Sequence, residues 1–297
     1  MTLAGPVLAL LSALIWGAGD FLGGLATRTA SSCARRVATQ LTGLTLALLC
    51  RLLVVEPVPG PAGIAWGLAA GASGLVGVAT LYRALARGTM GLVAPLTGLV
   101  AAALPALLGL AWGDPLTPLL GAGIVAALAA IVAISLPDRV PAGRTAPPLR
   151  RADLALVVVS GLGFSGFYLG IDRAHAEGLG AVSTLVALRC ASAALVLGAI
   201  VVLRGVRRTA PFRGVPRAVL PIVLLGGLAD TGGNLVYVLA NAVGTLSTTV
   251  VLGSLYPAST AILAAIVLRE RLTAARIVGV VLALVAAACI GLGALGA

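Results

Sequence analysis

VVLGSLYPASTAILAAIVLRERLTAARIVGVVLALVAAACIG, residues 250–291, is the stretch that decides the fold. It contains two apolar runs, each close to the roughly 20 residues that a helix needs to cross a hydrocarbon core of about 30 Å. Between them lies a short charged segment with Arg269, Glu270, Arg271 and Arg276. Two apolar runs joined by such a turn predict a helical hairpin that crosses a membrane twice.

The whole chain has the same character. Of its 297 residues, 60% are hydrophobic and only 10% are charged, whereas soluble proteins carry about 25% charged residues. This composition excludes a soluble enzyme and a soluble nucleic-acid-binding domain. The first run has no basic segment before it and is too long for a signal peptide, so we expect it to remain as the first span. We predict an all-α integral membrane protein, multi-pass in the cell membrane, with ten transmembrane helices over residues 3–26, 33–54, 62–82, 88–112, 116–136, 153–171, 180–203, 218–241, 244–268 and 272–295.

The basic residues predict the orientation of the chain. All 20 are arginines, and arginines in the gaps between spans orient those spans and contact lipid headgroups, so no nucleic-acid partner is implied. Arg51 and Arg173 belong to one side, and Arg189 lies inside a run. All the others belong to the opposite side: Arg28, Arg35, Arg36, Arg83, Arg87, Arg139, Arg144, Arg150, Arg151, Arg204, Arg207, Arg208, Arg213, Arg217, Arg269, Arg271 and Arg276. The positive-inside rule places that side in the cytoplasm and both termini outside.

The chain also repeats itself. The Pro- and Arg-rich segment 137–152 resembles a linker and separates two sets of five runs, residues 1–136 and 153–297. Polar and turn residues recur at nearly constant offsets: Gly19 and Gly23 with Gly166 and Gly170, Gly113–Thr117 with Arg269–Thr273, Gly123 with Gly279, and Tyr82 with Tyr237. Because five is an odd number of spans, the second copy enters the membrane in the opposite direction. We therefore predict two inverted-topology five-helix repeats, an arrangement common in secondary transporters.

The stretch quoted above resembles the C-terminal part of the EamA module of the drug/metabolite transporter superfamily. Its marks are Pro257 in the fourth span of the module, the turn Leu268–Leu272 and the Gly-containing span that follows. Residues 81–117 resemble a divergent copy, and Trp16 with the glycine after it resembles the first-span Trp-Gly of the family. The resemblance covers nearly the whole chain. It implies ten helices in two EamA-like modules, a central cavity, and transport or export of small metabolites or drugs.

The chain departs from the family at several positions. Asp114 stands where the family usually has Glu, Pro115 replaces an Arg, and Gln40 occupies the place that Arg189 has in the second copy. The ion pairs of the first turn and a symmetric role for the arginine are therefore not implied. Many family members have their termini inside the cell, whereas the arginines of this chain favour termini outside.

Asp230 is the first candidate for the site. It lies near the middle of its run, where a charged side chain costs roughly 2.5–3.5 kcal/mol and is tolerated facing water or a partner. Asn234 and Tyr237 follow at i+4 and i+7 on the same helical face, and Arg189 lies at similar depth in the preceding run. We expect Asp230 to face a water-accessible central cavity within ion-pair reach of Arg189 or a bound cation. Two alternatives stay open: a polar clamp that only holds helices together, and a fixed structural bridge in place of a site for carboxylate substrates.

Four further residues are candidates for substrate binding or coupling. Asp20 lies toward the arginine-rich end of the first run, one turn from Trp16. It is either a proton-coupling carboxylate or a residue of the membrane interface. Trp16, Tyr168 and Tyr256 can line a cavity, because aromatic faces suit cationic or amphipathic solutes. Ordinary packing or an interfacial belt is the alternative for each of them.

Prolines and small residues predict how the helices bend and pack. Pro95, Pro105 and Pro257 lie inside the fourth and ninth runs and can kink them, either statically or as gates. The G-x-x-x-G pairs 19/23, 67/71, 109/113 and 166/170 predict helix contacts. We expect the four cysteines to be small buried hydrophobes.

The sequence contains no motif for catalysis. It has no HExxH, GxSxG or Walker pattern, and its one histidine, His175, falls in a short gap where we expect a solvated side chain. We therefore predict no enzyme activity, no metal site and no cofactor.

These features together predict a secondary active transporter of small metabolites or drugs, an exporter that works by alternating access around a central cavity. Its expected partners are a small-molecule substrate, protons or another coupling ion, and the lipid bilayer, and no oligomer is required. An uptake carrier, a lipid-headgroup flippase and a non-transporting membrane scaffold or integral enzyme are the alternatives.

Overall fold

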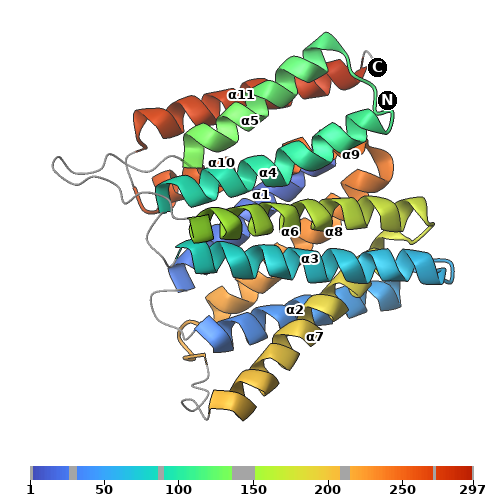
Figure 1. Cartoon of the computed structure of the whole chain (residues 1–297), viewed down its shortest axis with the longest axis vertical. Coiled ribbons are helices and arrows are strands. Elements are labelled where there is room, and N and C mark those ends of the chain that lie inside the picture. The colour runs from blue at the N-terminus through green and yellow to red at the C-terminus, as the bar shows by residue number, and fades with distance from the viewer. Residues whose placement is uncertain are drawn as a thin grey trace.

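The computed structural model of the chain describes residues 3–26, 32–85, 90–135, 151–207, 215–269 and 272–295. This part of the chain is helical and contains no strand, which confirms the predicted all-α class (Figure 1). Its helices are α1 (Ala4–Ala26), α2 (Ser32–Leu53), α3 (Pro61–Leu85), α4 (Met90–Ala111), α5 (Pro118–Ser135), α6 (Arg151–Ala176), α7 (Ala181–Arg207), α8 (Leu220–Val243), α9 (Leu246–Gly253), α10 (Tyr256–Val267) and α11 (Ala274–Leu295).

The helices are long and apolar enough for a multi-pass membrane protein. Within the described ranges, 8 helical stretches can cross a membrane by length and composition, and α9 with α10 counts as one of them. Two shorter apolar stretches, Val37–Leu53 in α2 and Leu96–Ala111 in α4, overlap the two remaining predicted runs. Each of the ten predicted runs therefore overlaps an apolar helical stretch, although α2 and α4 have shorter apolar segments than expected.

The ninth predicted run is not one continuous helix. The chain leaves the helix at Ser254 and Leu255 and resumes it with Tyr256 as the first residue of α10. Pro257 explains the break, because it has no N–H to donate to the carbonyl of Gly253. The kink predicted at Pro257 is thus present as a break, whereas α4 runs unbroken through Pro95 and Pro105.

Helices from the two halves of the chain pack against one another in matched pairs (Figure 1). Helix α5 packs against α11, α2 against α7, and α4 against α9, which joins equivalent helices of the two halves. The contact of α1 with α8 has its counterpart in α3 with α6, and the contact of α2 with α8 in α3 with α7. Each of these contacts between a helix of the first half and a helix of the second is therefore matched by a contact between the two equivalent helices of the opposite halves. A contact between two equivalent helices is its own match.

Small residues make the closest helix contacts. A Cβ atom added to Gly163 in α6 would lie 2.6 Å from the backbone nitrogen of Gly77 in α3. Gly166 and Gly170 also pack on α3, and Gly67 and Gly71 pack on α7, as the spacing predicts. The prediction is wrong for Gly113, which lies in a turn at φ +105°.

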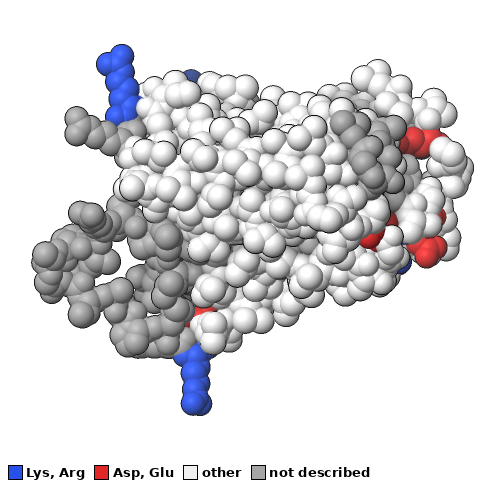
Figure 2. All heavy atoms as spheres, turned by 90° about the horizontal axis from the view of Figure 1, so that it is seen from above, with Lys and Arg blue, Asp and Glu red and all other residues white. Residues whose placement is uncertain are grey.

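Opposite charges gather at the two ends of the helix bundle. Arg83, Arg151, Arg217, Arg269 and Arg276 lie at one end, called here the arginine-rich end. The other end, called here the acidic end, carries Glu56, Asp114, Asp172 and Glu177 together with Arg51 and Arg173. Figure 2 shows arginines standing out at the first end and acidic side chains at the second. Helix α1 begins and α11 ends at the acidic end (Figure 1).

Two of these acidic residues cap helices of the second half. Glu56 accepts hydrogen bonds from the backbone N–H groups of Val182 (2.9 Å) and Ser183 (2.8 Å) and from the Ser183 hydroxyl (2.6 Å) at the start of α7. Burial acts to raise the pKa of Glu56, but these hydrogen bonds and the charge of Arg51 outweigh it and hold the pKa below its usual value. Asp114 Oδ2 accepts a hydrogen bond of 2.8 Å from the N–H of Ser247 at the start of α9.

The cysteines are not the buried residues that we expected. Cys190 is exposed, and Cys50 and Cys289 are half-buried; all three are free thiols. Lipid around an exposed position such as Cys190 is as apolar as a protein core and accommodates a thiol equally well. The side chain of Cys33 lies outside the described part of the structure.

Candidate functional site in the membrane interior

An ion pair between a buried arginine and a half-exposed aspartate lies at the centre of the site. Arg189 Nη1 in α7 is 2.7 Å from Asp230 Oδ2 in α8, so the predicted pair is present. The Arg189 side chain is 3% exposed and the Asp230 side chain 46% exposed. Asp230 lies roughly 15 Å from the start of α8 and 20 Å from its end at 1.5 Å per residue, which places the pair deep within the span.

A glycine makes room for the arginine. A Cβ atom on Gly43 in α2 would lie 3.3 Å from Arg189 Nη1 and would clash with the Thr231 hydroxyl. The equivalent position in the other half is built differently, since the amide oxygen of Gln40 accepts a hydrogen bond of 3.3 Å from Ser192 Oγ. Gln40 in the first half corresponds to Arg189 in the second, and Gly43 corresponds to Ser192, because both pairs are separated by the same number of residues. The contact of Gln40 with Ser192 is therefore equivalent to the contact of Arg189 with Gly43. It contains a neutral amide in one case and a charged guanidinium group in the other.

Arg189 keeps hydrogen-bonding capacity unused. Its Nε and Nη2 atoms are buried and have no hydrogen-bond partner among the described residues. Guanidinium N–H groups in a low-dielectric interior need acceptors, because leaving them unpaired costs free energy. The pair with Asp230 therefore satisfies only one edge of this side chain.

Five aromatic side chains pack together beside the pair, and four of them are predicted site residues. Trp16 stacks on Tyr237 with ring centroids 5.4 Å apart, and Tyr168 lies 5.0 Å from Tyr237. Tyr256 meets the Trp16 ring edge-on at 6.4 Å, and Phe167 completes the set at 5.4 Å from Tyr168. These five residues are called the aromatic cluster. Sequence reasoning missed Phe167, although it stands next to Tyr168.

One hydrogen bond fixes the indole ring in this cluster. Trp16 Nε1 donates to Asn234 Oδ1 at 2.8 Å. Trp16 lies flat against Gly233, where an added Cβ would be 2.7 Å from Nε1. Asn234, predicted to share the face of Asp230, is therefore the residue that positions Trp16 between the two halves.

Asp20 is exposed and lies on the inner face of α1. It follows Trp16 by four residues and so shares its helical face. On one side of that face a Cβ atom added to Gly19 would lie 3.3 Å from the backbone nitrogen of Asp230, and on the other Gly17 packs on Ser259 of α10. The carboxylate of Asp20 interacts electrostatically with that of Asp230, and no ion-pair partner for it occurs in the described ranges.

Helix α8 turns its polar side chains inward and its leucines outward. Asp230, Asn234, Tyr237 and Asn241 follow one another at helical spacing and lie within about 60° around the axis. The exposed Leu228 lies about 160° away from Asp230 on the same helix. The exposed part of Asp230 therefore faces the interior between α1, α2 and α7 and not the lipid.

Comparison with known protein families identifies the part of the chain that contains most of this site. Residues 152–292 match the model of the EamA-like transporter family. The second half of the chain is an EamA-like transporter module. The resemblance stated from the sequence is confirmed, and the residues matched include Arg189, Asp230, Asn234, Tyr237 and Tyr256. Members of this family are membrane transporters, which agrees with the multi-pass helical fold.

The fold of the whole chain resembles that of solved structures. Among 28 matching chains of solved structures is one described only as the crystal structure of a protein; it superposes with a TM-score of 0.73 and covers 100% of this chain and 99% of that one. Its sequence identity is 18%, so the likeness concerns the fold alone. No curated protein sequence matches this one.

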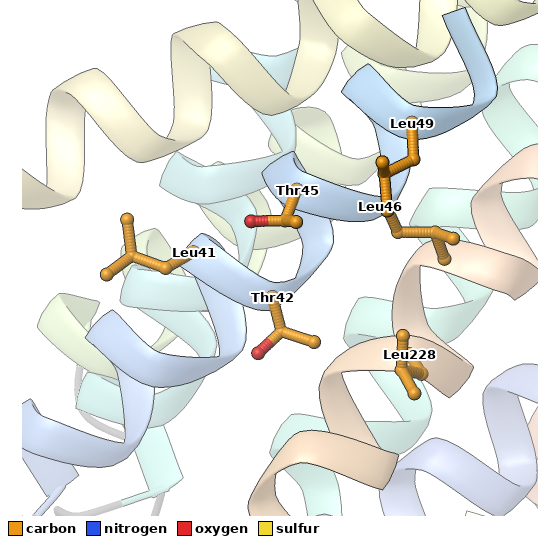
Figure 3. A pocket seen from close by; sticks show the side chains of 6 residues that line it. All are labelled: Leu41, Thr42, Thr45, Leu46, Leu49 and Leu228. Atoms are coloured by element: carbon orange, nitrogen blue, oxygen red, sulfur yellow. The ribbon is translucent and has the colours of Figure 1, made fainter. Parts of the chain in front are cut away.

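Two hollows on the surface of the described part of the chain lie outside the site. One, of about 330 Å³, lies between α2 and α8 and is lined by Leu41, Thr42, Thr45, Leu46, Leu49 and Leu228 (Figure 3). Another, of about 510 Å³, lies between α3 and α6. Neither is lined by Asp20, Asp230 or the aromatic cluster. Neither is therefore the central cavity that the family resemblance implies.

His175 is not the solvated loop residue that we predicted. Helix α6 extends to Ala176, so Asp172, Arg173 and His175 all belong to its last two turns. Both ring nitrogens of His175 are buried without a hydrogen-bond partner among the described residues. The prediction failed because the apolar run was ended at the first charged residue, whereas the helix continues beyond it.

Proposed function

We propose that this EamA protein is a secondary active transporter that exports small metabolites or drugs by alternating access. The observation that carries the proposal is the Arg189–Asp230 ion pair, which lies deep in the membrane interior with Asp230 turned toward the contact between the halves. Charges in such a place are costly and belong to substrate or ion pathways. Asp20 adds a second carboxylate on the facing helix.

The proposed mechanism uses two copies of one module, residues 1–136 and 153–297, in opposite orientations. Two contacts between α5 and α11 support this. Gly123 packs against Ile290, and Gly279 packs against Ile134, with both pairs of equivalent residues 156 positions apart. The first contact lies toward the acidic end and the second toward the arginine-rich end. A rotation that exchanges them must also exchange the ends, so its axis lies in the membrane plane.

The turns after the fourth span of each half support the same symmetry. Gly113 has φ +105° and Arg269 has φ +54°, and they too are 156 residues apart. An arginine rarely adopts this left-handed conformation, whereas glycine does so readily. The same turn geometry at equivalent positions indicates two copies of one folding unit.

The arrangement of the site supports an arginine-end-open state. Asp20 lies on the arginine-end side of Trp16, and Asp230 lies on the arginine-end side of Tyr237. Both carboxylates are exposed, whereas Tyr237 is fully buried. The aromatic cluster therefore separates the acidic end from the carboxylates. With the arginine-rich end in the cytoplasm, a solute loads from the cytoplasm and leaves past the aromatic cluster.

A transport experiment tests the proposal. Growth of an overexpressing strain on a panel of amino acids, nucleosides and antibiotics identifies a transported compound. Its uptake into vesicles is then measured with and without an imposed pH gradient for wild type, Asp230→Asn, Arg189→Gln and the double variant. We expect Asp230→Asn to abolish gradient-driven transport while leaving exchange largely intact. Full activity of Asp230→Asn would remove the site assignment, and wild-type transport indifferent to the gradient would remove proton coupling.

The orientation is tested separately. A reporter that is active only in the cytoplasm, fused to the C-terminus, should remain inactive if both termini lie outside. Strong reporter activity would reverse the orientation and, with it, the direction of loading.

A further inference from the structure

Buried polar groups without partners gather at the acidic end, beyond the aromatic cluster. Asn241 is 7% exposed, and both atoms of its amide lack a hydrogen-bond partner among the described residues. The Tyr237 hydroxyl, on a side chain that is 0% exposed, also lacks a hydrogen-bond partner among the described residues, and so do both ring nitrogens of His175. Buried polar atoms are almost always paired in stable structures, so each exception calls for an explanation.

These groups continue the polar face of the site. On α8, Asn241 follows Asp230 by eleven residues, which is roughly 16 Å along the helix and close to the same face. On α6, Asp172 and His175 share the face of Tyr168 at i+4 and i+7. The two helices contact each other, and the Asn241 amide interacts with the side chains of Asp172 and His175 without an ordinary hydrogen bond. One polar strip therefore runs from Asp230 past the aromatic cluster to the acidic end.

A purely structural role does not explain the strip. Leucine has the same branched arrangement of side-chain heavy atoms as asparagine and would occupy the position of Asn241 without leaving any polar atom unpaired. Unpaired groups are disfavoured in this closed arrangement and become favourable when water or a ligand reaches them. The groups thus fit a second state of the molecule in which the acidic end is open.

We propose that Tyr237, Asn241, His175 and Asp172 line the acidic-end half of the transport path and bind the polar part of the solute when that end opens. The site presents a carboxylate, an amide and a phenol, which suits a group that donates hydrogen bonds, such as an ammonium, amide or hydroxyl group. This inference rests on the proposed transport function, and it adds a second binding station beyond the one at Asp230.

The turn between α4 and α5 holds this half of the path closed. Asp114 binds the N–H of Ser247 at 2.8 Å, and the Arg173 guanidinium carbon lies 3.8 Å from the centre of the Trp112 ring. Both contacts join the first half of the chain to helices of the second half. Opening the acidic end requires them to break, so Asp114→Ala should increase the population of the open state.

Thiol labelling tests the path without any transported compound. In a variant with Cys33, Cys50, Cys190 and Cys289 replaced by serine, single cysteines are placed at Asn241, Ala240 and Glu177. The protein is reconstituted in nanodiscs, where a charged methanethiosulfonate reagent reaches both ends. We expect Asn241→Cys to react at least threefold faster when Asp114→Ala is added. Ala240→Cys, on the adjacent buried face, should remain unreactive, and the exposed Glu177→Cys should react quickly in both backgrounds.

Equal labelling of positions 240 and 241, or no labelling at 241 while position 177 reacts, would overturn the inference. Because labelling does not depend on transport, this failure is distinguishable from failure of the proposed function. Thermal unfolding of Asn241→Leu gives a second measurement that does not depend on thiol labelling. A path residue predicts an unchanged or higher midpoint, since two unpaired polar atoms are removed, and a clearly lower midpoint would assign Asn241 a structural role.

Discussion

The contact between α3 and α6 and the contact between α1 and α8 occupy equivalent places in the two halves, yet they are built from different residues. In the first contact Gly77 faces Gly163, and the backbones approach so closely that neither position accepts a side chain. In the second, Gly233 corresponds to Gly77, but Trp16 stands where Gly163 would be. The indole ring fills the space that backbone fills in the other contact.

The charges differ in the same way. Gly74 in α3 packs against Phe167 in α6, with an added Cβ 3.1 Å from the ring. The residues at the corresponding places in α8 and α1 are Asp230 and Asp20. A glycine–phenylalanine contact is thus replaced by two carboxylates. The α3–α6 contact holds its two helices together without any charge, which agrees with the proposed role of the carboxylates in transport.

The largest effect is expected in the α3–α6 contact. Gly163→Ala places a methyl group 2.6 Å from the Gly77 nitrogen, and separating the two helices should cost about 3 kcal/mol or more. We expect little folded protein, measured as monodisperse material in fluorescence-detected size-exclusion chromatography. Gly198→Ala in α7, where an added Cβ meets nothing within 4 Å, is the control and should be neutral or stabilising by up to about 1 kcal/mol. Equal yields for the two variants would contradict this account.

A variant whose α1–α8 contact lacks charges, like the α3–α6 contact, tests whether the charges are needed for stability or for transport. The triple variant Asp20→Phe, Asp230→Ala, Arg189→Gln copies the uncharged character of Phe167, Gly74 and Gln40. Replacing both partners of an ion pair that holds a buried charge is often neutral or stabilising, so the unfolding midpoint should stay within a few degrees of wild type. Transport in vesicles should be lost. Retained transport would show that these charges are dispensable.

Trp16→Phe should have a moderate effect. The ring stays in the aromatic cluster, but the hydrogen bond to Asn234 is lost, at about 1 kcal/mol. If that bond positions the ring during transport, the rate should fall roughly fivefold. Asn234→Leu removes the same bond from the other side, and a double-mutant cycle on transport rates should show that the two losses are not additive. Additive losses would mean that the bond has no role of its own.

The smallest effect is expected at Glu56, far from both contacts. Because folding lowers the pKa of this carboxylate, its contribution is present above the pKa of the unfolded state and disappears as the pH falls through the folded-state value. Glu56→Gln should lower stability by about 1 kcal/mol at neutral pH, as for the loss of a helix cap. Unfolding midpoints measured from neutral to acidic pH should converge once wild-type Glu56 is protonated. A constant difference at all pH values would exclude the charged cap.

The helices and the charged pair were predictable from the sequence because they follow from short-range rules. Run length predicts spans, and the i, i+4 and i+7 positions of Asp230, Asn234 and Tyr237 predict one inner face. The same helical spacing extends to Asn241, so the sequence also indicates that Asn241 lies on this inner face. The approach of Trp16 to Gly233 was not predictable, because it depends on how closely two distant helices pack.

Two other features depended on information that the sequence does not carry locally. The packing of five aromatic side chains between the halves was not predicted, because side-chain patterns indicate which face is inner but not which conformational state is populated. The break at Ser254 and Leu255 was signalled by Pro257. Pro105 gave the same signal in α4, where the helix continues without a break. Only the packing around each proline decides between these outcomes.

The two glycine–isoleucine contacts between α5 and α11 have a consequence for how the chain is joined. Each surface presents the same glycine and the same isoleucine to the other, so the contact is isologous, in the sense used for the interface of a two-fold dimer. In such an interface every favourable contact between two side chains occurs twice, once on each side of the two-fold axis. In the proposed architecture of two inverted modules, the halves therefore associate as two subunits of a homodimer would, through a self-complementary surface carried by each, although one polypeptide contains both.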